Sequence, residues 1–389
     1  MTDIISAPSP AGPLAREQTK AHGAGAQNPA EILLKGWKDI LWRVYDEIGE
    51  DRVLLVAGGV TFYILLAFVP GLTALISFYG LFLDRTTILD HLSLLQGVIP
   101  GGGLDIVKDQ LQRITINSNM TLDLTSLIST GIALWSANAG IKGLFEAMNV
   151  AYGEHEKRSL IRLNVVTMTF TIMALASMVA FMAIMIVLPQ ALAYLWLSES
   201  AKWLIKGLAF AGMFAMFAAG VAATYRWGPS RNEASWKWIT PGTLLAVVVA
   251  AIVSVLFSWY VSNFGSYNAT YGSLCAVIGF VTWIWILMII LIVGAELNAE
   301  TEQQTAADTT VAPNEPPGQR GAHAADTSEN PALEVSPKWR RKQPLHSEGP
   351  HKAGGRISIG QLAVALPAAA LLYWYGKKQA AKVAREEHT

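Results

Sequence analysis

The sequence predicts an all-α fold: a polytopic membrane helical bundle with six transmembrane helices, interfacial helices and a disordered C-terminal linker. Of its 389 residues, 52% are hydrophobic and only 15% are charged, and the mean hydropathy is +0.36. Soluble domains are about 25% charged, so this composition excludes a disordered chain and argues against a soluble enzyme. Basic and acidic residues are equal in number, 29 each, and this balance gives no net charge to attract nucleic acid.

Six stretches are long and apolar enough to span a bilayer, for which about 20 helical residues suffice. The second is the most polar, and the others carry almost no charge. In chain order, the predicted spans are 53–83, 124–148, 164–188, 203–225, 241–263 and 274–295. Pro70 interrupts the first span, and Pro241 is expected in the first turn of the fifth.

The regions outside the spans divide the chain further. Residues 1–30 predict a disordered N-terminal tail, and 31–300 a six-helix membrane domain. Residues 301–356 are rich in Pro, Ala, Thr and charge, and predict a disordered linker. Residues 357–389 predict a C-terminal hydrophobic helix and basic tail, and whether 357–375 spans the membrane stays open.

Two flanking segments predict interfacial helices. Residues 31–50 place apolar side chains on one face by 3–4 spacing. Residues 86–116 suggest two short amphipathic helices around a glycine hinge, or a plain covering loop. Lys and Arg are more frequent before the first span and in the loops 149–163 and 226–240, which predicts a cytoplasmic N-terminus.

Polar residues inside the second span form a pattern. Asn138, Lys142, Glu146 and Asn149 recur at 3–4 spacing on one helical face. Charges inside a span are costly and usually face protein or a water cavity. With Glu296, these residues form a candidate polar path for a substrate. The alternative is that Lys142 and Glu146 lie near the interface and merely pair with each other.

Glu296 ends the sixth span, where its charge opposes the helix dipole. This placement favours a role as partner of a basic group such as Lys142 or Arg226, or as a proton or cation relay. The alternative is an interfacial carboxylate in water.

The hairpin 262–273 is polar, glycine-rich and uncharged, and suggests either a gate or a tight aromatic turn. The candidate gate and hinge residues are Pro70, Pro241, Gly242, Tyr267, Asn268, Tyr271 and Gly272.

Catalytic signatures are missing from the sequence. No two of the seven histidines are two or four residues apart. Cys275 is the single cysteine, so a zinc site built from several thiolates is excluded. The sequence contains neither a Gly-x-Ser-x-Gly elbow nor a phosphate-binding Gly-x-x-x-x-Gly-Lys-Ser/Thr loop. We therefore expect no catalytic residues, no metal site, no cofactor and no enzyme activity.

Residues 240–300 carry the most specific pattern. Pro241-Gly242 precedes the fifth span, and Gly294, Ala295, Glu296 and Leu297 end the sixth. Between these motifs stand the aromatic and glycine residues Tyr260, Tyr267, Tyr271, Gly272, Trp283 and Trp285. The pattern resembles the YihY/BrkB family of bacterial inner-membrane proteins, and the resemblance covers roughly 31–300. It implies six spans with both ends of the core in the cytoplasm. It implies no settled activity, because members have carried both ribonuclease and virulence labels.

These features favour a transporter or a lipid or solute exporter of unknown substrate. The alternative is a non-transporting membrane scaffold or envelope-integrity factor, and ribonuclease activity is not expected. The expected partners are the lipid bilayer and an unidentified small solute or amphiphile. Homo-oligomer formation stays open, and nucleic acid is not an expected partner.

Overall fold

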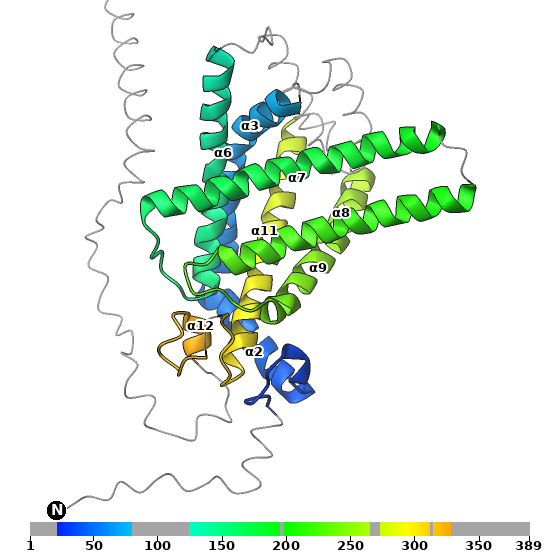
Figure 1. The fold of residues 1–389 in the computed structure, drawn as a ribbon. Coiled ribbons are helices and arrows are strands. Elements are labelled where there is room, and N and C mark those ends of the chain that lie inside the picture. The colour runs from blue at the N-terminus through cyan, green and yellow to red at the C-terminus, as the bar shows by residue number, and fades with distance from the viewer. Residues whose placement is uncertain (1–21, 80–123, 195–197, 265–272, 312–313, 328–389) are drawn as a thin grey trace, which may run out of the picture. The chain divides into compact units, whose positions relative to one another are not determined.

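The computed structural model describes residues 22–79, 124–194, 198–264, 273–311 and 314–327 (Figure 1). All of them belong to one compact unit, Met1–Val335. A second unit, Ser336–Thr389, lies outside the described residues, and the predicted C-terminal helix lies with it. The segment 86–116 and the linker residues 328–356 also lie outside them.

The described residues are almost entirely helical, and no strand occurs among them beyond an isolated bridge between Ala234 and Thr310. The all-α prediction is therefore confirmed. In order, the elements are η1 (Pro29–Glu31), α2 (Leu34–Glu50), α3 (Val53–Tyr79), α6 (Leu124–Ala151), α7 (Leu160–Tyr194), α8 (Glu199–Trp227), α9 (Trp236–Phe264), α11 (Ser273–Gln303) and α12 (His323–Asp326).

Four of these helices, α7, α8, α9 and α11, contain a described segment long and apolar enough to cross a membrane. The bent pair of α2 and α3 would make a fifth span. Six spans thus stays a prediction. The segment predicted as the second span forms α6, whose polar side chains lower its hydropathy. Large apolar side chains on α8, such as Leu208 and Phe210, are exposed, as lipid-facing residues are.

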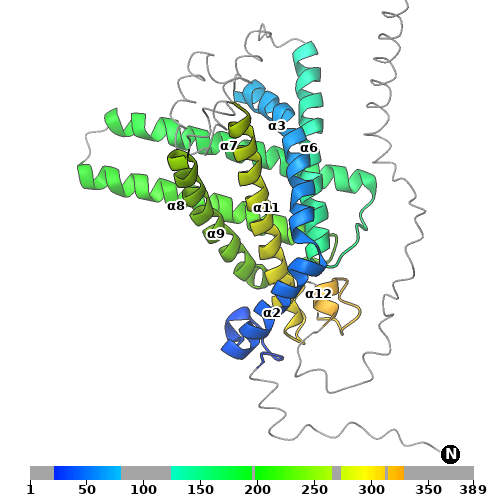
Figure 2. The same ribbon diagram turned by 180° about the vertical axis from the view of Figure 1, so that it is seen from behind.

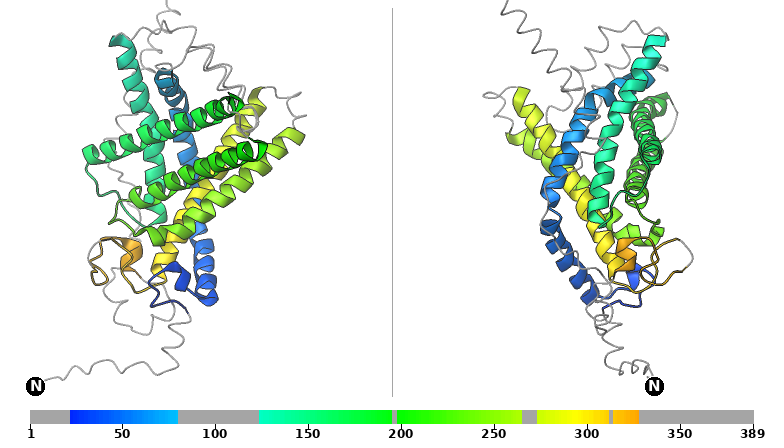
Figure 3. Two further views of the ribbon diagram at one scale, coloured as in Figure 1. Left: turned by 45° about the vertical axis from the view of Figure 1, so that its right-hand side comes forward. Right: turned by 90° about the vertical axis from the view of Figure 1, so that its left-hand side faces the viewer.

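Each long helix packs against the next one along the chain, and the last of them packs against the first (Figure 1, Figure 2). α3 packs along α6, α6 against α7, α7 against α8, α8 against α9 and α9 against α11, while α11 returns to α3. α7 and α8 run side by side across the other long helices (Figure 3). Val60, Met148, Ala246 and Ile292 are among the buried residues that form the shared core.

A very close helix contact joins α9 and α11. A Cβ atom on Gly242 would collide with the carbonyl oxygen of Gly294, and one on Gly294 would collide with the Tyr225 hydroxyl. That hydroxyl donates to the Leu291 carbonyl at 2.8 Å. The Gly242 amide donates to Asn298 Oδ1 at 2.7 Å. The two glycines therefore allow the backbones of α9 and α11 to touch.

Both candidate hinge prolines lie inside helices rather than at their ends. Pro70 lies within α3, and Pro241 follows the first turn of α9, which begins at Trp236. The expected first-turn position of Pro241 is therefore wrong. The buried side chains of Trp238 and Ile239 extend the helix toward its N-terminus. A hinge role for either proline stays a prediction.

The amphipathic helix predicted over 31–50 is observed as α2. Its buried residues Ile40 and Val44 pack with Trp238 and Leu297. The chain then bends by 63° into α3, at a break where Arg52 takes a φ of 51°. Such a positive φ is uncommon for a residue with a side chain. We call this break, Glu50–Val53, the elbow.

Candidate functional site: a buried polar base at the end of α11

The C-terminal end of α11 is polar yet buried. Its side chains at Glu296, Asn298, Glu300, Thr301 and Glu302 are each no more than 2% exposed. Most polar groups in a protein interior are satisfied by hydrogen-bond or ionic partners, because burying an unpaired polar group is costly. We call this region the polar base; it consists of residues 22–32, 51, 152–158, 226–235, 296–311 and 314–327.

Parts of the N-terminal tail and of the linker that were predicted to be disordered are ordered in the polar base. α11 continues to Gln303, and Thr305, Thr309 and Arg320 are buried beyond it. At the other end, Ala24 and Ala26 are also buried. Composition suggested a tail because residues 1–30 are rich in Ala, Gly and Pro, and a linker because residues 301–356 are rich in Pro, Ala, Thr and charge. The polar side chains instead find partners on distant segments, which composition does not reveal.

An ion pair lies at the centre of the polar base. Arg231 Nη2 lies 2.6 Å from Glu302 Oε1, and both side chains are fully buried. Thr309 donates to the second Glu302 oxygen at 2.7 Å. The Arg231 guanidinium also lies over the Tyr152 ring, 4.4 Å from its centroid. Its Nε and Nη1 atoms have no hydrogen-bond partner in the described part of the chain.

Three further polar atoms near this ion pair also lack a partner among the described residues. They are the Tyr152 hydroxyl, Asn298 Nδ2 and Glu296 Oε1. Tyr152 lies within reach of a side-chain hydrogen bond with Asn298, but the contact does not meet hydrogen-bond geometry; Tyr152 also lies close to Arg231 and Glu296. Burial raises the pKa of the Tyr152 hydroxyl well above its usual value, so the group stays protonated at neutral pH. We call Tyr152, Arg231, Glu296 and Asn298 the unpaired cluster.

Glu296 does not meet either of the basic partners suggested from the sequence. Its carboxyl group hydrogen-bonds with that of Asp51 at the elbow. Arg226 instead pairs with Glu233 at 2.7 Å. Lys142 Nζ lies 5.3 Å from the ring centroid of Trp135. The bend between α2 and α3 brings Asp51 to α11, and no local pattern in the sequence predicts that contact.

The other candidate path residues do not gather in one place. Asn138 is buried and accepts a hydrogen bond from Thr171 at 3.1 Å. Asn149 is buried and accepts from the Ser230 amide at 2.7 Å. Lys142 is half-buried, whereas Glu146 is exposed. The two asparagines thus tie α6 to α7 and to the polar base, and a substrate path along α6 stays a prediction.

The predicted gate in the hairpin 262–273 has its central residues outside the described part of the chain. Tyr267, Asn268, Tyr271 and Gly272 all belong to the segment 265–272. Their role stays a prediction.

Hydrogen bonds also hold the loop between α6 and α7 in place. Arg158 binds both carboxylate oxygens of Glu156 at 2.7 Å and donates to the Gly228 carbonyl at 2.7 Å. Burial alone would raise the pKa of Glu156, but hydrogen bonds from Arg158 and Asn149 outweigh it and lower the pKa to about 2. The pair therefore stays charged at physiological pH and joins this loop to the end of α8.

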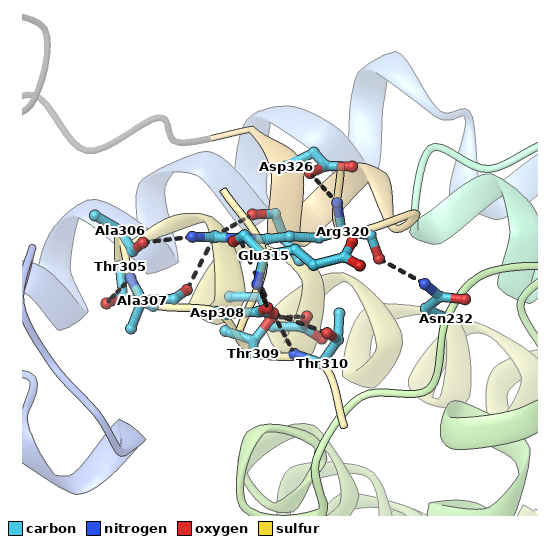
Figure 4. Close-up of polar contacts among 12 residues, drawn as sticks. Asn232, Thr305, Ala306, Ala307, Asp308, Thr309, Thr310, Glu315, Arg320 and Asp326 are labelled. Atoms are coloured by element: carbon cyan, nitrogen blue, oxygen red, sulfur yellow. Dashed lines mark hydrogen bonds and ion pairs between the residues drawn. The ribbon is translucent and has the colours of Figure 1, made fainter. Parts of the chain in front are cut away.

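Arg320 organises the segment that follows α11 (Figure 4). Its guanidinium donates to the carbonyl oxygens of Ala306, Ala307, Glu315 and Ala325 at 2.7–3.1 Å. These bonds hold residues 306–311 and 314–327 together in one compact segment, which we call the cap.

Two further contacts fasten the cap to other parts of the polar base. Asn232 Nδ2 donates to the Arg320 carbonyl at 2.8 Å (Figure 4). The His323 amide donates to Glu154 Oε1 at 2.7 Å. The cap is therefore joined both to the α8–α9 loop and to the α6–α7 loop.

Replacing Arg320 with alanine should loosen the cap, because it leaves four carbonyl groups without their donor. We expect the free energy of unfolding to fall by about 2–3 kcal/mol. Limited proteolysis of the purified protein should then cut within 306–327 faster than in wild type. Arg162→Ala, which removes an exposed arginine, is the control. Equal cleavage rates in both variants would contradict the role of Arg320.

Sequence reasoning missed Tyr152, Arg231, Asn298 and Glu302. One signal was present: Asn298 and Glu302 follow Gly294 at intervals of four and continue one face of α11. Arg231 and Tyr152 lie in loop segments without periodicity, so nothing local marked them. Within the described residues, no group of three or more His, Cys, Asp or Glu side chains could hold a metal ion.

Long apolar helices around a buried polar end define the class: this is a polytopic α-helical membrane protein. The chain belongs to the Virulence factor BrkB family, which it matches over residues 44–319. The match extends beyond residue 300, where the sequence resemblance was expected to end, and so includes most of the polar base.

Curated relatives carry names of two kinds. A ribonuclease-like protein, YfkH, of Bacillus subtilis is 29% identical over 54% of this chain and 76% of its own length. A UPF0761 membrane protein of Neisseria meningitidis serogroup B is 25% identical over 66% of this chain and 62% of its own length. Another from Photobacterium profundum is 24% identical over 65% of this chain and 77% of its own length. No solved structure gives a significant match.

Proposed function

We propose that this protein is a transporter or exporter of a small polar solute or an amphiphile. We place it in the bacterial inner membrane with its N-terminus in the cytoplasm. The observation that carries this proposal is the unpaired cluster, enclosed at one end of a bundle of apolar helices. Buried polar atoms are rarely left without partners, and a cluster of them suits a ligand that supplies the missing hydrogen bonds.

The chemistry of the cluster favours an oxygen-rich ligand. Arg231 and Asn298 offer N–H donors, and the Tyr152 hydroxyl can donate as well. Carboxylate, phosphate and hydroxyl oxygens are the acceptors that would satisfy them. Glu296 Oε1 could accept from an ammonium or hydroxyl group of the same molecule. Because the cluster is buried, the cap would have to move for a ligand to enter from that side.

Tyr152→Phe provides a sharp test of this proposal. The substitution removes only a hydroxyl that lies beside Asn298 without a hydrogen bond of good geometry among the described residues, so stability should change little. Purified full-length protein would be reconstituted in vesicles and assayed with carboxylates, phosphorylated solutes, polyols and lipids. For the transported solute, we expect the apparent affinity to fall about 2–10-fold, the loss expected for one hydrogen bond.

Tyr45→Phe is the matched control, because Tyr45 is 68% exposed on α2 and lies outside the unpaired cluster. It should leave flux unchanged. Flux should also differ between wild type and Glu296→Gln. If wild type moves no solute in the panel, the transport proposal fails. If Tyr152→Phe transports every solute as wild type does, the cluster is not the binding site.

A scaffold or envelope-integrity role is the second candidate, and the folded cap favours it. The cap is an ordered segment after α11, the last apolar helix that the structure describes, and residues 328–389 follow it. A deletion to test this role should begin at Ser336, because the compact unit extends to Val335. Loss of an envelope phenotype with flux intact would favour the scaffold, whereas loss of flux with the phenotype intact would contradict it.

The ribonuclease-like name of one relative suggests a separate assay. We propose that the chain has no enzyme activity and no nucleic-acid partner. RNA cleavage by pure protein, abolished by a chelator, would overturn this.

A further inference from the structure

Two carboxyl groups meet where the elbow touches α11. Glu296 is only 2% exposed, and its side chain hydrogen-bonds with that of Asp51. An ionised carboxylate can only accept hydrogen bonds, so one of two hydrogen-bonded carboxyl groups must carry a proton. The other Glu296 oxygen, Oε1, has no partner among the described residues. The two carboxyl groups can therefore share one proton, and Glu296 Oε1 can still accept a further hydrogen bond.

The described residues around the pair offer little positive charge that could replace that proton. The charged groups that act on the pair are Glu47 and Glu50 of α2 and Glu300 of α11, and Tyr152 lies close to Glu296. Arg52 follows Asp51 in the elbow, and Arg43, Arg231 and Glu302 contact these neighbours. Arg43 is paired with Glu300 and also donates to Gln304 at 2.7 Å. Arg231 is paired with Glu302. Arg52 is exposed. Two ionised carboxylates in contact at this position would repel each other across a poorly solvated space.

We propose that Asp51 and Glu296 form a proton-binding site that holds one proton at neutral pH and joins the elbow to α11. Release of the proton would place two like charges on opposite sides of this contact. The backbone of the elbow would move in response to this repulsion, because the chain there already bends by 63° and Arg52 has a positive φ. A further consequence, that the proton drives solute movement, rests on the proposed transport function.

Infrared spectroscopy of the full-length protein in lipid nanodiscs tests the site without any transport assay. At pH 7, wild type should show the C=O band of a protonated carboxylic acid, shifted in heavy water. Glu296→Gln should abolish this band. Asp51→Asn should also abolish it, because the amide then donates to Glu296 without a shared proton. Asp51 lies at the partly exposed elbow, so this variant remains informative if Glu296→Gln fails to fold.

Asp46→Asn is the matched control, since Asp46 is an exposed carboxylate of α2 close in sequence to Asp51. It should leave the band unchanged. The proposal is overturned if wild type lacks the band at pH 7, or if the band survives either substitution. It is also overturned if sodium removes the band at constant pH, because the pair would then be a cation site.

Flux measurements separate this inference from the proposed function. If wild-type vesicles show flux that responds to an imposed pH gradient, Asp51→Asn should abolish the response. A band without any solute flux would support the proton site and contradict transport. Flux without the band would contradict the proton site alone.

Discussion

Gly242→Ala is expected to produce one of the largest losses of stability in this protein. The new Cβ atom would collide with the Gly294 carbonyl oxygen and crowd the Asn298 side chain. Backbone atoms at a helix–helix contact can yield only if the two helices move apart. Overpacked cores lose about 1–3 kcal/mol and sometimes more, and we expect about 3 kcal/mol or more here. Thermal unfolding of the purified protein in detergent would measure it.

The control is Gly212→Ala in α8, where an added Cβ atom meets no other atom within 4 Å. That variant should keep or slightly raise the melting temperature, because alanine favours the helix. If Gly242→Ala unfolds at the same temperature as the control, then α9 and α11 do not pack as closely as the structure shows.

Breaking the Arg231–Glu302 pair should be comparably costly. Both side chains are fully buried and 2.6 Å apart, so Arg231→Met would leave the Glu302 carboxylate without its counter-charge. Removing one partner of a buried pair typically costs about 3–5 kcal/mol. The free energy of unfolding, measured by chemical denaturation in mild detergent, should fall by that amount.

The double variant Arg231→Met, Glu302→Met tests whether the loss comes from the unpaired charge. Apolar replacement of a whole buried pair is often close to neutral, so the double variant should recover most of the lost stability. A loss equal to the sum of the two single losses would instead mean that the residues act independently.

The helices were largely predictable, and the reason is visible at particular positions. In lipid, backbone groups must be satisfied within the segment itself, so long uncharged stretches form helices. The apolar stretches 164–188 and 274–295 lie within α7 and α11. Helix ends were less predictable. α9 begins at Trp236 rather than beside Pro241, since buried Trp238 and Ile239 extend the helix toward its N-terminus.

The candidate site was predictable only in part. The charge of Glu296 at the end of a span singled it out, because it opposes the helix dipole. Its neighbour Asp51 comes from a part of the chain far away in sequence. Asn138 and Asn149 matched the polar pattern and are buried, whereas Glu146 shared their helical spacing and is exposed. Spacing along the helix therefore predicted which residues share a face, but it did not predict which of them are buried.

The sequence by itself determined that this chain is a helical membrane protein of the BrkB family. Hydropathy and the motifs ending in Gly294, Ala295, Glu296 and Leu297 are local properties, and they can be read without a fold. Only the tertiary structure decided that the polar run after them is buried rather than a solvated linker. Burial of a polar side chain depends on a partner, and the partners of Glu296, Glu300 and Glu302 are Asp51, Arg43 and Arg231. These pairs join distant parts of the chain, so they exist only once the helices have packed.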